Sequence, residues 1–260
     1  MKRNLKIFWL LSTYSAKTAL QHRVGMISFV AGKMIRFVFY VLFIYFLVSK
    51  TRFLAGYSLQ QTIIFFLTFN FLDTLAQLLF REVYRFRPLI VSGEFDNVLV
   101  KPYHPFIRVL IGGVDIMDAI TIVPYLAFLL YFVLKIPHLN AINAVLYGGF
   151  LINGLLLATA FHILILAVGI LTTEVDNTIM MYRDFTKMLS LPIDIYKEPF
   201  RSFLMFVIPV GIMMAVPVKI LFGLLTPNMV IITIMISIVF TLISFFTWNR
   251  ALKRYQSWGG

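Results

Sequence analysis

The sequence contains no cysteine and few charged residues. Without a thiol, disulfide bonds and thiolate chemistry are excluded. Asp, Glu, Lys and Arg make up only 13% of the 260 residues, whereas a soluble domain has about 25%. Hydrophobic residues make up 60% of the chain. This balance indicates an all-α polytopic membrane protein, in which residues 1–260 form a single transmembrane domain.

Nucleotide-binding and catalytic motifs are also missing. The nearest approach to a phosphate-binding loop runs from Gly25 to Lys33, but its spacing is wrong and no Ser or Thr follows the lysine. The four histidines form no H-E-x-x-H pair, and no G-x-S-x-G occurs. We therefore expect no cofactor in this chain. An ATP-driven process would need ATP and Mg²⁺ bound by another polypeptide.

Six apolar segments are each close to the roughly 20 residues that a helix needs to cross a bilayer. They occupy residues 24–49, 59–80, 109–134, 141–171, 201–217 and 227–249. Before them, residues 1–23 hold an amphipathic helix with Ile7, Leu10 and Tyr14 on one face. The sequence therefore predicts six transmembrane helices preceded by an interfacial helix.

The basic residues indicate an orientation for these spans. The net charge of +12 is not by default a sign of nucleic acid, because Lys and Arg in a membrane protein report topology and lipid contact. With the N-terminus inside, the outer side holds only Lys50, Arg52, Lys135 and Lys219. The inner set includes Lys197 and Arg201. The positive-inside rule then places both termini and residues 81–108 in the cytoplasm.

Residues 209–225 combine prolines, glycines and an apolar piece too short to cross the membrane. Pro209 and Pro217 each remove a backbone donor, so no continuous helix with 201–208 is expected. We interpret the region as a broken or re-entrant segment near the outer face, with Lys219 reaching the outer interface. A plain extracellular loop is the alternative. Irregular backbone survives in a membrane only where protein buries it or where it lines a cavity.

Five charged residues fall inside the predicted spans, where each is costly in lipid. Lys33 and Arg36 share a face of the first span. Asp73 lies in the second span, and Asp115 and Asp118 share a face of the third. Counted at 1.5 Å per residue from the inner ends, their depths agree, on the order of 10–20 Å. The sequence predicts an ion-paired cluster that either fixes helix packing or takes part in a substrate or proton path.

Asp115 and Asp118 also form a D-x-x-D pair. Membrane prenyl transferases use such aspartates to hold magnesium diphosphate, which needs hard oxygen ligands. A membrane-embedded enzyme that modifies a lipid or prenyl diphosphate is therefore the alternative function. Its support is weak, because only one such pair occurs.

A polar, basic stretch at 81–108 interrupts the apolar sequence after the second span. Within it, Gly93 opens a short helix, and Glu94 and Asp96 lie in the first turn, where acids complement the helix dipole. Lys101-Pro102 closes the helix, because proline cannot continue its hydrogen bonding. We expect a small helix outside the membrane, with an ordinary loop as the alternative.

This short helix has one apolar face. Phe95, Val98 and Leu99 fall at i, i+3 and i+4. An exposed apolar face in the cytoplasm calls for a partner. We expect these three residues to contact another protein, and the alternative is that the face folds back onto the membrane surface.

The stretch from Gly93 to Pro102, G-E-F-D-N-V-L-V-K-P, resembles the G-x-x-D-x-x-L-x-K-P element of ABC-2 family transporter permeases. Further matches are Leu191–Tyr196, Phe206–Val210 and the tail Leu252–Ser257. These matches follow one another in order along essentially the whole chain. The sequence is therefore similar to the membrane subunit of an ABC exporter.

The resemblance implies an exporter of two permeases, identical or paralogous, and two cytoplasmic ATPase subunits, in the bacterial cytoplasmic (inner) membrane. The permease would not be an enzyme. Residues 1–23 resemble the connecting helix, 209–225 the re-entrant outer helices, and 93–101 the coupling helix that docks on the ATPase. The substrate is not identified. A chain with 16% aromatic residues suits a lipid-like or amphipathic substrate, although lipid-facing surfaces require the same residues.

Overall fold

The structure is a computed structural model that describes residues 2–257, most of which lie in helices. The two ends of the predicted domain 1–260 lie outside the described residues. Five of the described helices are long and apolar enough to cross a membrane. They are α2 (Arg23–Thr51), α3 (Leu59–Phe80), α6 (Ile116–Leu134), α7 (Ala141–Thr172) and α12 (Pro227–Arg254). The protein is thus a polytopic membrane protein, as predicted.

Polar residues begin several of these helices. Ser58 and Gln61 form a reciprocal capping box at the start of α3. Asn140 caps α7, and Thr226 caps α12 with Pro227 in its first turn. These caps satisfy backbone N–H groups that would otherwise lack partners at each helix start.

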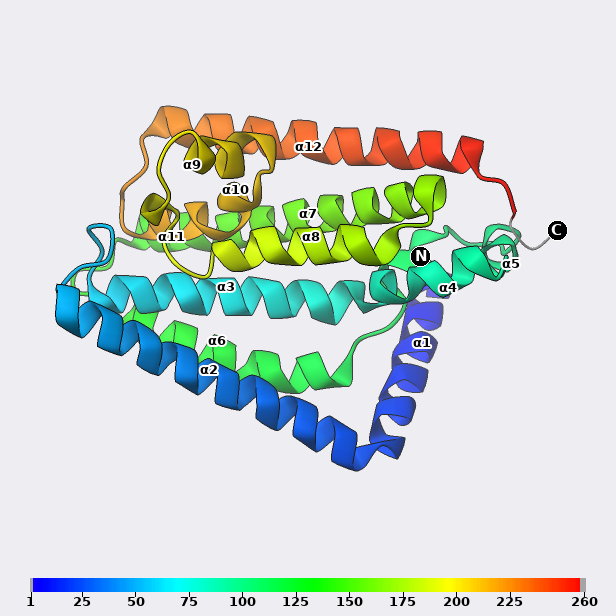
Figure 1. The fold of residues 1–260 in the computed structure, drawn as a ribbon, viewed down its shortest axis with the longest axis horizontal. Helices are drawn as coiled ribbons and strands as arrows, with labels where there is room; N and C mark the ends of the chain where they lie inside the picture. The colour runs from blue at the N-terminus through cyan, green and yellow to red at the C-terminus, as the bar shows by residue number, and fades with distance from the viewer. Residues whose placement is uncertain (1, 258–260) are drawn as a thin grey trace.

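The long helices lie side by side, with α3 and α7 in the middle and α2 and α12 at the periphery (Figure 1). Helix α1 (Lys2–Gln21) crosses one end of the bundle, where α4 (Phe86–Val91) and α5 (Phe95–Leu99) also lie (Figure 1). We call this the basal end, and both described chain ends lie toward it. The opposite, distal end carries the loop 52–58 between α2 and α3 (Figure 1).

Helix α1 packs on the bundle where α6 begins. The Ser12 hydroxyl donates to the Phe8 carbonyl at 2.8 Å and accepts from the Val114 N–H at 3.1 Å. Trp9 and Tyr14 are exposed. This helix therefore has one side held by the bundle and another with large apolar side chains, as an interfacial helix requires.

The predicted fifth span at 201–217 is wrong. That segment is divided among α9 (Phe200–Ser202), a π-helical turn (Phe203–Val207), α10 (Val210–Met214) and α11 (Val216–Leu221). The return from the basal end is made instead by α8 (Val175–Met188), which runs beside α7 (Figure 1). Helix α8 contains charged residues, so it forms no apolar run and hydropathy does not reveal it.

The broken character predicted for 209–225 is confirmed. Pro217 lies in the first turn of α11, where its missing N–H is tolerated. Every residue of α10 is buried. A Cβ on Gly154 of α7 would lie 2.7 Å from the Met213 carbonyl oxygen, so glycine permits this close approach. The irregular backbone is therefore enclosed by protein, as a membrane environment demands.

Asp194 ties the distal end together. Its carboxylate accepts hydrogen bonds from Lys219 Nζ and from the Tyr57 hydroxyl, each at 2.8 Å, and Arg201 lies 3.6 Å away. Lys219 does not reach outward as predicted, because its side chain is only 15% exposed and is held in this pair. Arg201, expected on the inner side, lies instead with Tyr57 at the distal end.

These contacts set the protonation of Asp194. Burial by itself would raise the pKa of this carboxyl, but the hydrogen bonds from Lys219 and Tyr57, with the charges of Lys219 and Arg201, hold it below its usual value. Stability from this group is present above the unfolded-state pKa and is lost as the pH falls through the lower folded-state pKa.

We predict that Asp194→Asn lowers thermal stability at pH 7 by about 1.5–3 kcal/mol, the usual range for hydrogen bonds with a charged group. The loss should shrink as the pH is lowered, because the wild-type carboxylate then loses its charge as well. Tyr57→Phe removes one neutral donor and should cost less. Scanning fluorimetry of the purified protein between pH 3 and 7 measures both. An equal loss at every pH would contradict the assignment.

Candidate functional site

Ion pairs fix the polar segment that follows α3. Arg81 Nε lies 3.3 Å from Asp115 Oδ2. Glu82 accepts from Arg85 at 2.9 Å and from Arg108 on its other oxygen. These pairs join the start of the segment to its end, so the basal segment is a structured element and not an open loop.

The predicted short helix is present as α5, but its apolar face is oriented differently from the prediction. Phe95 and Val98 are buried, and Leu99 is half-buried. The Phe95 ring packs edge-on against Phe86 and against Tyr255 of the C-terminal tail, with centroid distances of 5.2 Å in both cases. The prediction of an exposed apolar knob is therefore wrong, because the chain itself covers this face.

The exposed side of this region is instead the opposite one. Val91, Glu94, Asn97 and Val100 are exposed at intervals of three residues, and Lys101 and Pro102 continue the exposed surface. Val100 is 82% exposed. Between the two short helices, Gly93 adopts φ +75°, which lets the chain turn sharply. We call Val91, Glu94, Asn97 and Val100 the basal tip.

The intramembrane charges lie within electrostatic reach of their neighbours: Asp73 of Lys33, Arg36 and Asp118, and Asp118 of Asp115. Lys33 pairs with Asp118, which confirms that a basic residue of the first span pairs with an acid of the third. Asp115 lies at the start of α6, where it accepts from the Met117 and Asp118 N–H groups and pairs with Arg81. Asp115 therefore caps its own helix beside the Lys33–Asp118 pair.

This arrangement removes the basis for a D-x-x-D metal site. The carboxylate of Asp115 faces Arg81 and its own helix start, whereas that of Asp118 faces Lys33. Within residues 2–257, no group of three or more His, Asp or Glu side chains is arranged to hold a metal ion. The two aspartates thus serve packing and capping here.

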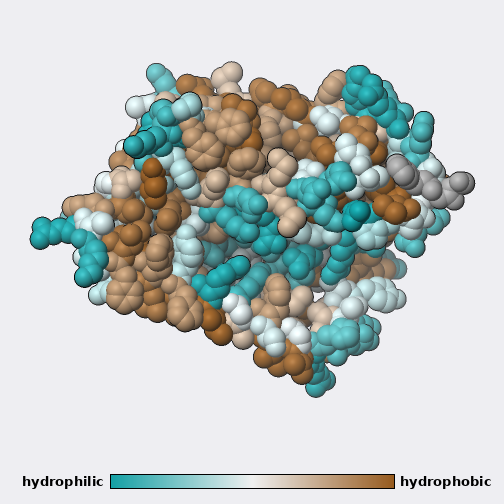
Figure 2. Space-filling model, in the orientation of Figure 1, coloured by the Kyte–Doolittle hydropathy of each residue, from teal (hydrophilic) through white to brown (hydrophobic). Residues whose placement is uncertain are grey.

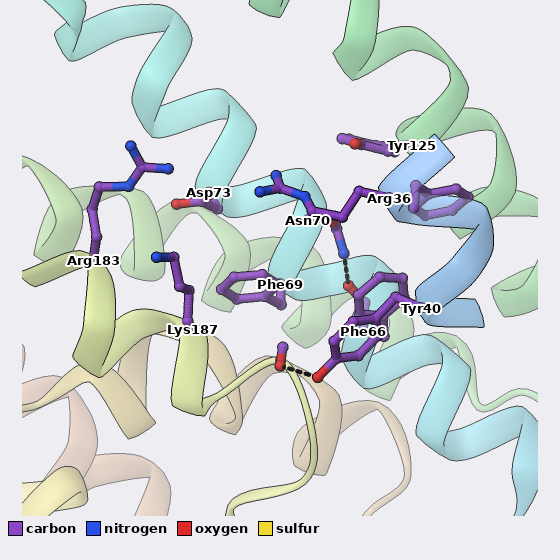
Figure 3. Close-up of a pocket in the computed structure, with 11 residues that line it drawn as sticks. Arg36, Tyr40, Phe66, Phe69, Asn70, Asp73, Tyr125, Arg183 and Lys187 are labelled. Carbon is purple, nitrogen blue, oxygen red and sulfur yellow. Dashed lines mark hydrogen bonds between the residues drawn. The ribbon is translucent and has the colours of Figure 1, made fainter. Parts of the chain in front are cut away.

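Arg36 and Asp73 line a cavity of about 210 Å³ between α2, α3, α6 and α8. Arg183 and Lys187 of α8 line it as well, and Figure 3 shows the three basic side chains directed toward the space beside Asp73. Asp73 accepts from Gln77 at 2.6 Å. Arg183 and Lys187 fall between the predicted spans at 141–171 and 201–217, so neither was expected among the intramembrane charges.

Aromatic side chains form the other wall of the cavity. The Tyr40 and Phe66 rings stack with centroids 4.5 Å apart, and Phe37 packs on Tyr125 at 4.9 Å. The Tyr40 hydroxyl is 2.8 Å from Ser190 Oγ, which links α2 to the chain just after α8. The cavity therefore joins a cationic side to an apolar, aromatic side.

The surface over α8 is hydrophilic in the middle of an otherwise apolar face (Figure 2). Asp184 and Lys187 are exposed there and form an ion pair of 3.4 Å. Exposed α2 and α12 carry large apolar side chains along most of their length. A hydrophilic strip along α8, between the two ends of the bundle, suits contact with water or with another subunit, because charged groups that face lipid are costly.

Comparison with known proteins agrees with these features. A family model described as ABC-2 family transporter protein matches residues 34–259, which is most of the chain. The chain belongs to the ABC-2 family of transporter proteins. No curated protein and no solved structure matches it significantly.

Membership in the ABC-2 family assigns the general role of the chain. It is the membrane component of an ABC transporter, a family whose members are typically non-catalytic permeases that work with ATPase partners. The match does not indicate the substrate. The basal tip and the cavity are thus the two candidate functional surfaces of an ABC-2 membrane subunit.

We predict that replacing one partner of the Lys33–Asp118 pair lowers the stability of the protein more than replacing both partners. Lys33→Met leaves a buried carboxylate without its partner, and such a loss costs roughly 3–5 kcal/mol. Adding Asp118→Asn removes the orphaned charge, so the double variant should be closer to wild type. Thermal unfolding of the single and double variants measures the difference. Lys50→Met at the exposed end of α2 is the control, and additive losses in the double variant would contradict the pairing.

Proposed function

We propose that this chain is the permease of an ATP-driven exporter, assembled from two permeases and two cytoplasmic ATPase subunits in the bacterial cytoplasmic membrane. The observation that carries the proposal is the family match over residues 34–259, together with a rigid basal tip at the end toward which both described termini lie. The absence of a phosphate-binding loop agrees with ATP binding by a partner.

The charge distribution supports a cytoplasmic basal end. Lys197 and Arg201 belong to the distal end and not to the inner side, which weakens the predicted excess of Lys and Arg on the inner side but does not reverse it. The basal end still holds more basic residues than the distal end. They lie in α1, in the basal segment and at the basal ends of α2 and α12, namely Lys6, Lys17, Arg23, Arg81, Arg85, Arg87, Lys101, Arg108, Arg250, Lys253 and Arg254. By the positive-inside rule, the basal end faces the cytoplasm and the distal end faces outward.

The sixth crossing in this proposal is made by α8 and the segment that follows it. Helix α7 ends at the basal end and α12 begins at the distal end (Figure 1). The chain between them must therefore pass from one side to the other. Residues 193–221 then form the re-entrant part near the outer face, held by Asp194 and by packing on α7.

The hydrophilic strip over α8 supports a second permease. Asp184 and Lys187 would be costly against lipid, whereas a second subunit facing them across a polar path would keep them hydrated. Both α2 and α12 have apolar surfaces that suit lipid. We place the translocation path on the α8 face, between two copies of this chain or between this chain and a paralogue.

Coupling then follows from linkage between the ATPase and the permease. An ATPase that closes on ATP must contact the two states of the permease differently in order to shift their populations. The basal tip is the exposed contact at that end, and η1 (Arg81–Arg85) connects it directly to α3, which lines the cavity. A displacement of the tip can therefore be transmitted to the cavity through one continuous element.

We predict that Val91→Asp with Val100→Asp abolishes substrate-stimulated ATP hydrolysis and weakens ATPase binding. Both side chains are exposed, so the variant should fold like the wild type. Phe95→Ala is the contrasting variant. It removes a buried ring and should lower thermal stability by about 3–5 kcal/mol. The measurement uses the tagged chain purified from its own host, with all copurifying chains identified and counted by mass spectrometry.

In the wild type we expect an ATPase and a permease in equal numbers. The absence of any ATPase from the purified wild-type complex would overturn the proposed function. Normal ATPase binding and normal stimulation in the double valine variant would overturn the assignment of the basal tip alone. Thr13→Asp with Thr18→Asp, which adds the same charge at exposed positions of α1 outside the basal tip, is the matched control.

A further inference from the structure

We infer that the cavity between α2, α3, α6 and α8 binds the anionic headgroup of an amphipathic substrate, with Arg36 and Arg183 as the recognising groups. This inference rests on the proposed export function and deepens it by naming the substrate class. The apolar part of the substrate would lie against the aromatic wall and extend out of the cavity toward the bilayer.

Basic side chains outnumber acidic ones in the lining of the cavity. Arg36, Arg183 and Lys187 face a single carboxylate, Asp73. Among residues 2–257, neither Arg36 nor Arg183 forms an ion pair with a carboxylate, and Arg183 lies over the Tyr84 ring at 6.0 Å. Lys187 pairs with the exposed Asp184. The cavity thus holds two guanidinium groups that share one nearby carboxylate, Asp73, and form no direct ion pair with it.

The depth of these arginines makes the lack of a direct ion pair informative. Arg36 lies in the middle part of α2, a helix long and apolar enough to span the membrane. Ionisable residues at such positions are rare and mark substrate or ion pathways. The neighbouring Lys33 is neutralised by an ion pair with Asp118, as expected of a charge that serves only the packing of helices. Arg36, one turn away, is instead directed into the cavity.

Guanidinium chemistry points to the kind of anion. A guanidinium presents planar N–H donors that match phosphate and carboxylate oxygens in a bidentate manner. Arg36 and Arg183 approach the cavity from different helices, α2 and α8, so an anion between them would be held from two sides. A cationic ligand on Asp73 with the aromatic rings is disfavoured, because three cations line the same cavity.

The size and the second wall indicate an amphiphile. A volume of about 210 Å³ is below the roughly 300–1,000 Å³ of a pocket for a drug-sized ligand. The cavity therefore suits a headgroup and the first part of a chain. The stacked Tyr40 and Phe66 rings provide an apolar surface for that part. An inorganic anion would leave this aromatic wall unused.

The test uses the purified transporter complex in nanodiscs of phosphatidylcholine. The probe is a single-chain alkyl phosphate with a diazirine near its headgroup, and matched probes carry trimethylammonium or hydroxyl in place of phosphate. Labelled residues are located by mass spectrometry after irradiation. We expect the phosphate probe to label α2, α3 or α8 around the cavity, and the cationic and neutral probes to label it at least about tenfold less, because charge-assisted hydrogen bonds are the strong class.

Arg36→Gln with Arg183→Gln should reduce cavity labelling by the phosphate probe at least about tenfold. The control Lys50→Gln with Lys135→Gln removes the same charge at the distal ends of α2 and α6 and should leave labelling unchanged. Arg36→Lys with Arg183→Lys keeps the charge but loses the bidentate geometry, so it should recover labelling only in part. An equal loss in the distal control would overturn the local assignment.

Two further arms separate the sources of the headgroup. Inorganic phosphate in excess should not compete, and competition by it alone would overturn the amphiphile assignment. Phosphatidylglycerol in the nanodisc should compete if a bilayer lipid is the occupant. Its failure to compete, with retained probe labelling, would assign a different anionic amphiphile as cargo. Equal labelling by all three probes would overturn the inference. If an ATPase still copurifies, that result leaves the proposed export function intact.

Discussion

The cost of placing charge and unpaired backbone in lipid governs this structure. Lys33 lies within a span and is neutralised by Asp118 of another helix. The short helices α10 and α11 break the backbone repeatedly, and the bundle buries them. Where the chain leaves the apolar region, Arg81 and Glu82 find partners across the basal segment. Arg36 and Arg183 are exceptions, because neither forms a direct ion pair within the described residues, and both line the cavity.

The same constraint relates the two candidate surfaces to each other. Helix α3 contributes Asp73 to the cavity and continues through η1 to the basal tip. Arg81, at the end of α3, is tied to Asp115 at the start of α6, another helix that lines the cavity. A partner that displaces the tip would therefore act on two walls of the cavity together. Such coupling needs an element with two discrete arrangements, and the α3–α6 pair is our candidate.

Much of the fold follows from the sequence. Long, mainly apolar runs predict α2, α3, α7 and α12 closely, and the prolines predict the broken segment near Pro209 and Pro217. Depth counting placed Lys33 and Arg36 level with three aspartates, and Lys33 does pair with one of them, Asp118. These successes share a cause, since each depends on local periodicity or on a rule about charge in lipid.

The failures depend on contacts between distant parts of the chain. Helix α8 was missed because its charged face is satisfied by a cavity and a polar strip that only the tertiary fold creates. The i, i+3, i+4 pattern of Phe95, Val98 and Leu99 in α5 correctly indicates an apolar face. However, periodicity cannot tell whether a partner covers it or, as found for Phe95, the protein's own Tyr255. Asp115 was placed inside a span because hydropathy overlooks the break at Gly112 before α6.

The central claim is that α8 presents a hydrated, charged face at membrane depth, and cysteine accessibility tests it most directly. The natural chain has no cysteine, so single substitutions need no altered background. Asp184→Cys and Lys187→Cys in the assembled transporter should react readily with a small hydrophilic maleimide. Leu242→Cys, on the exposed apolar side of α12, should not. If the two α8 cysteines were as unreactive as the one on α12, the polar path, and with it the role given to α8, would be wrong.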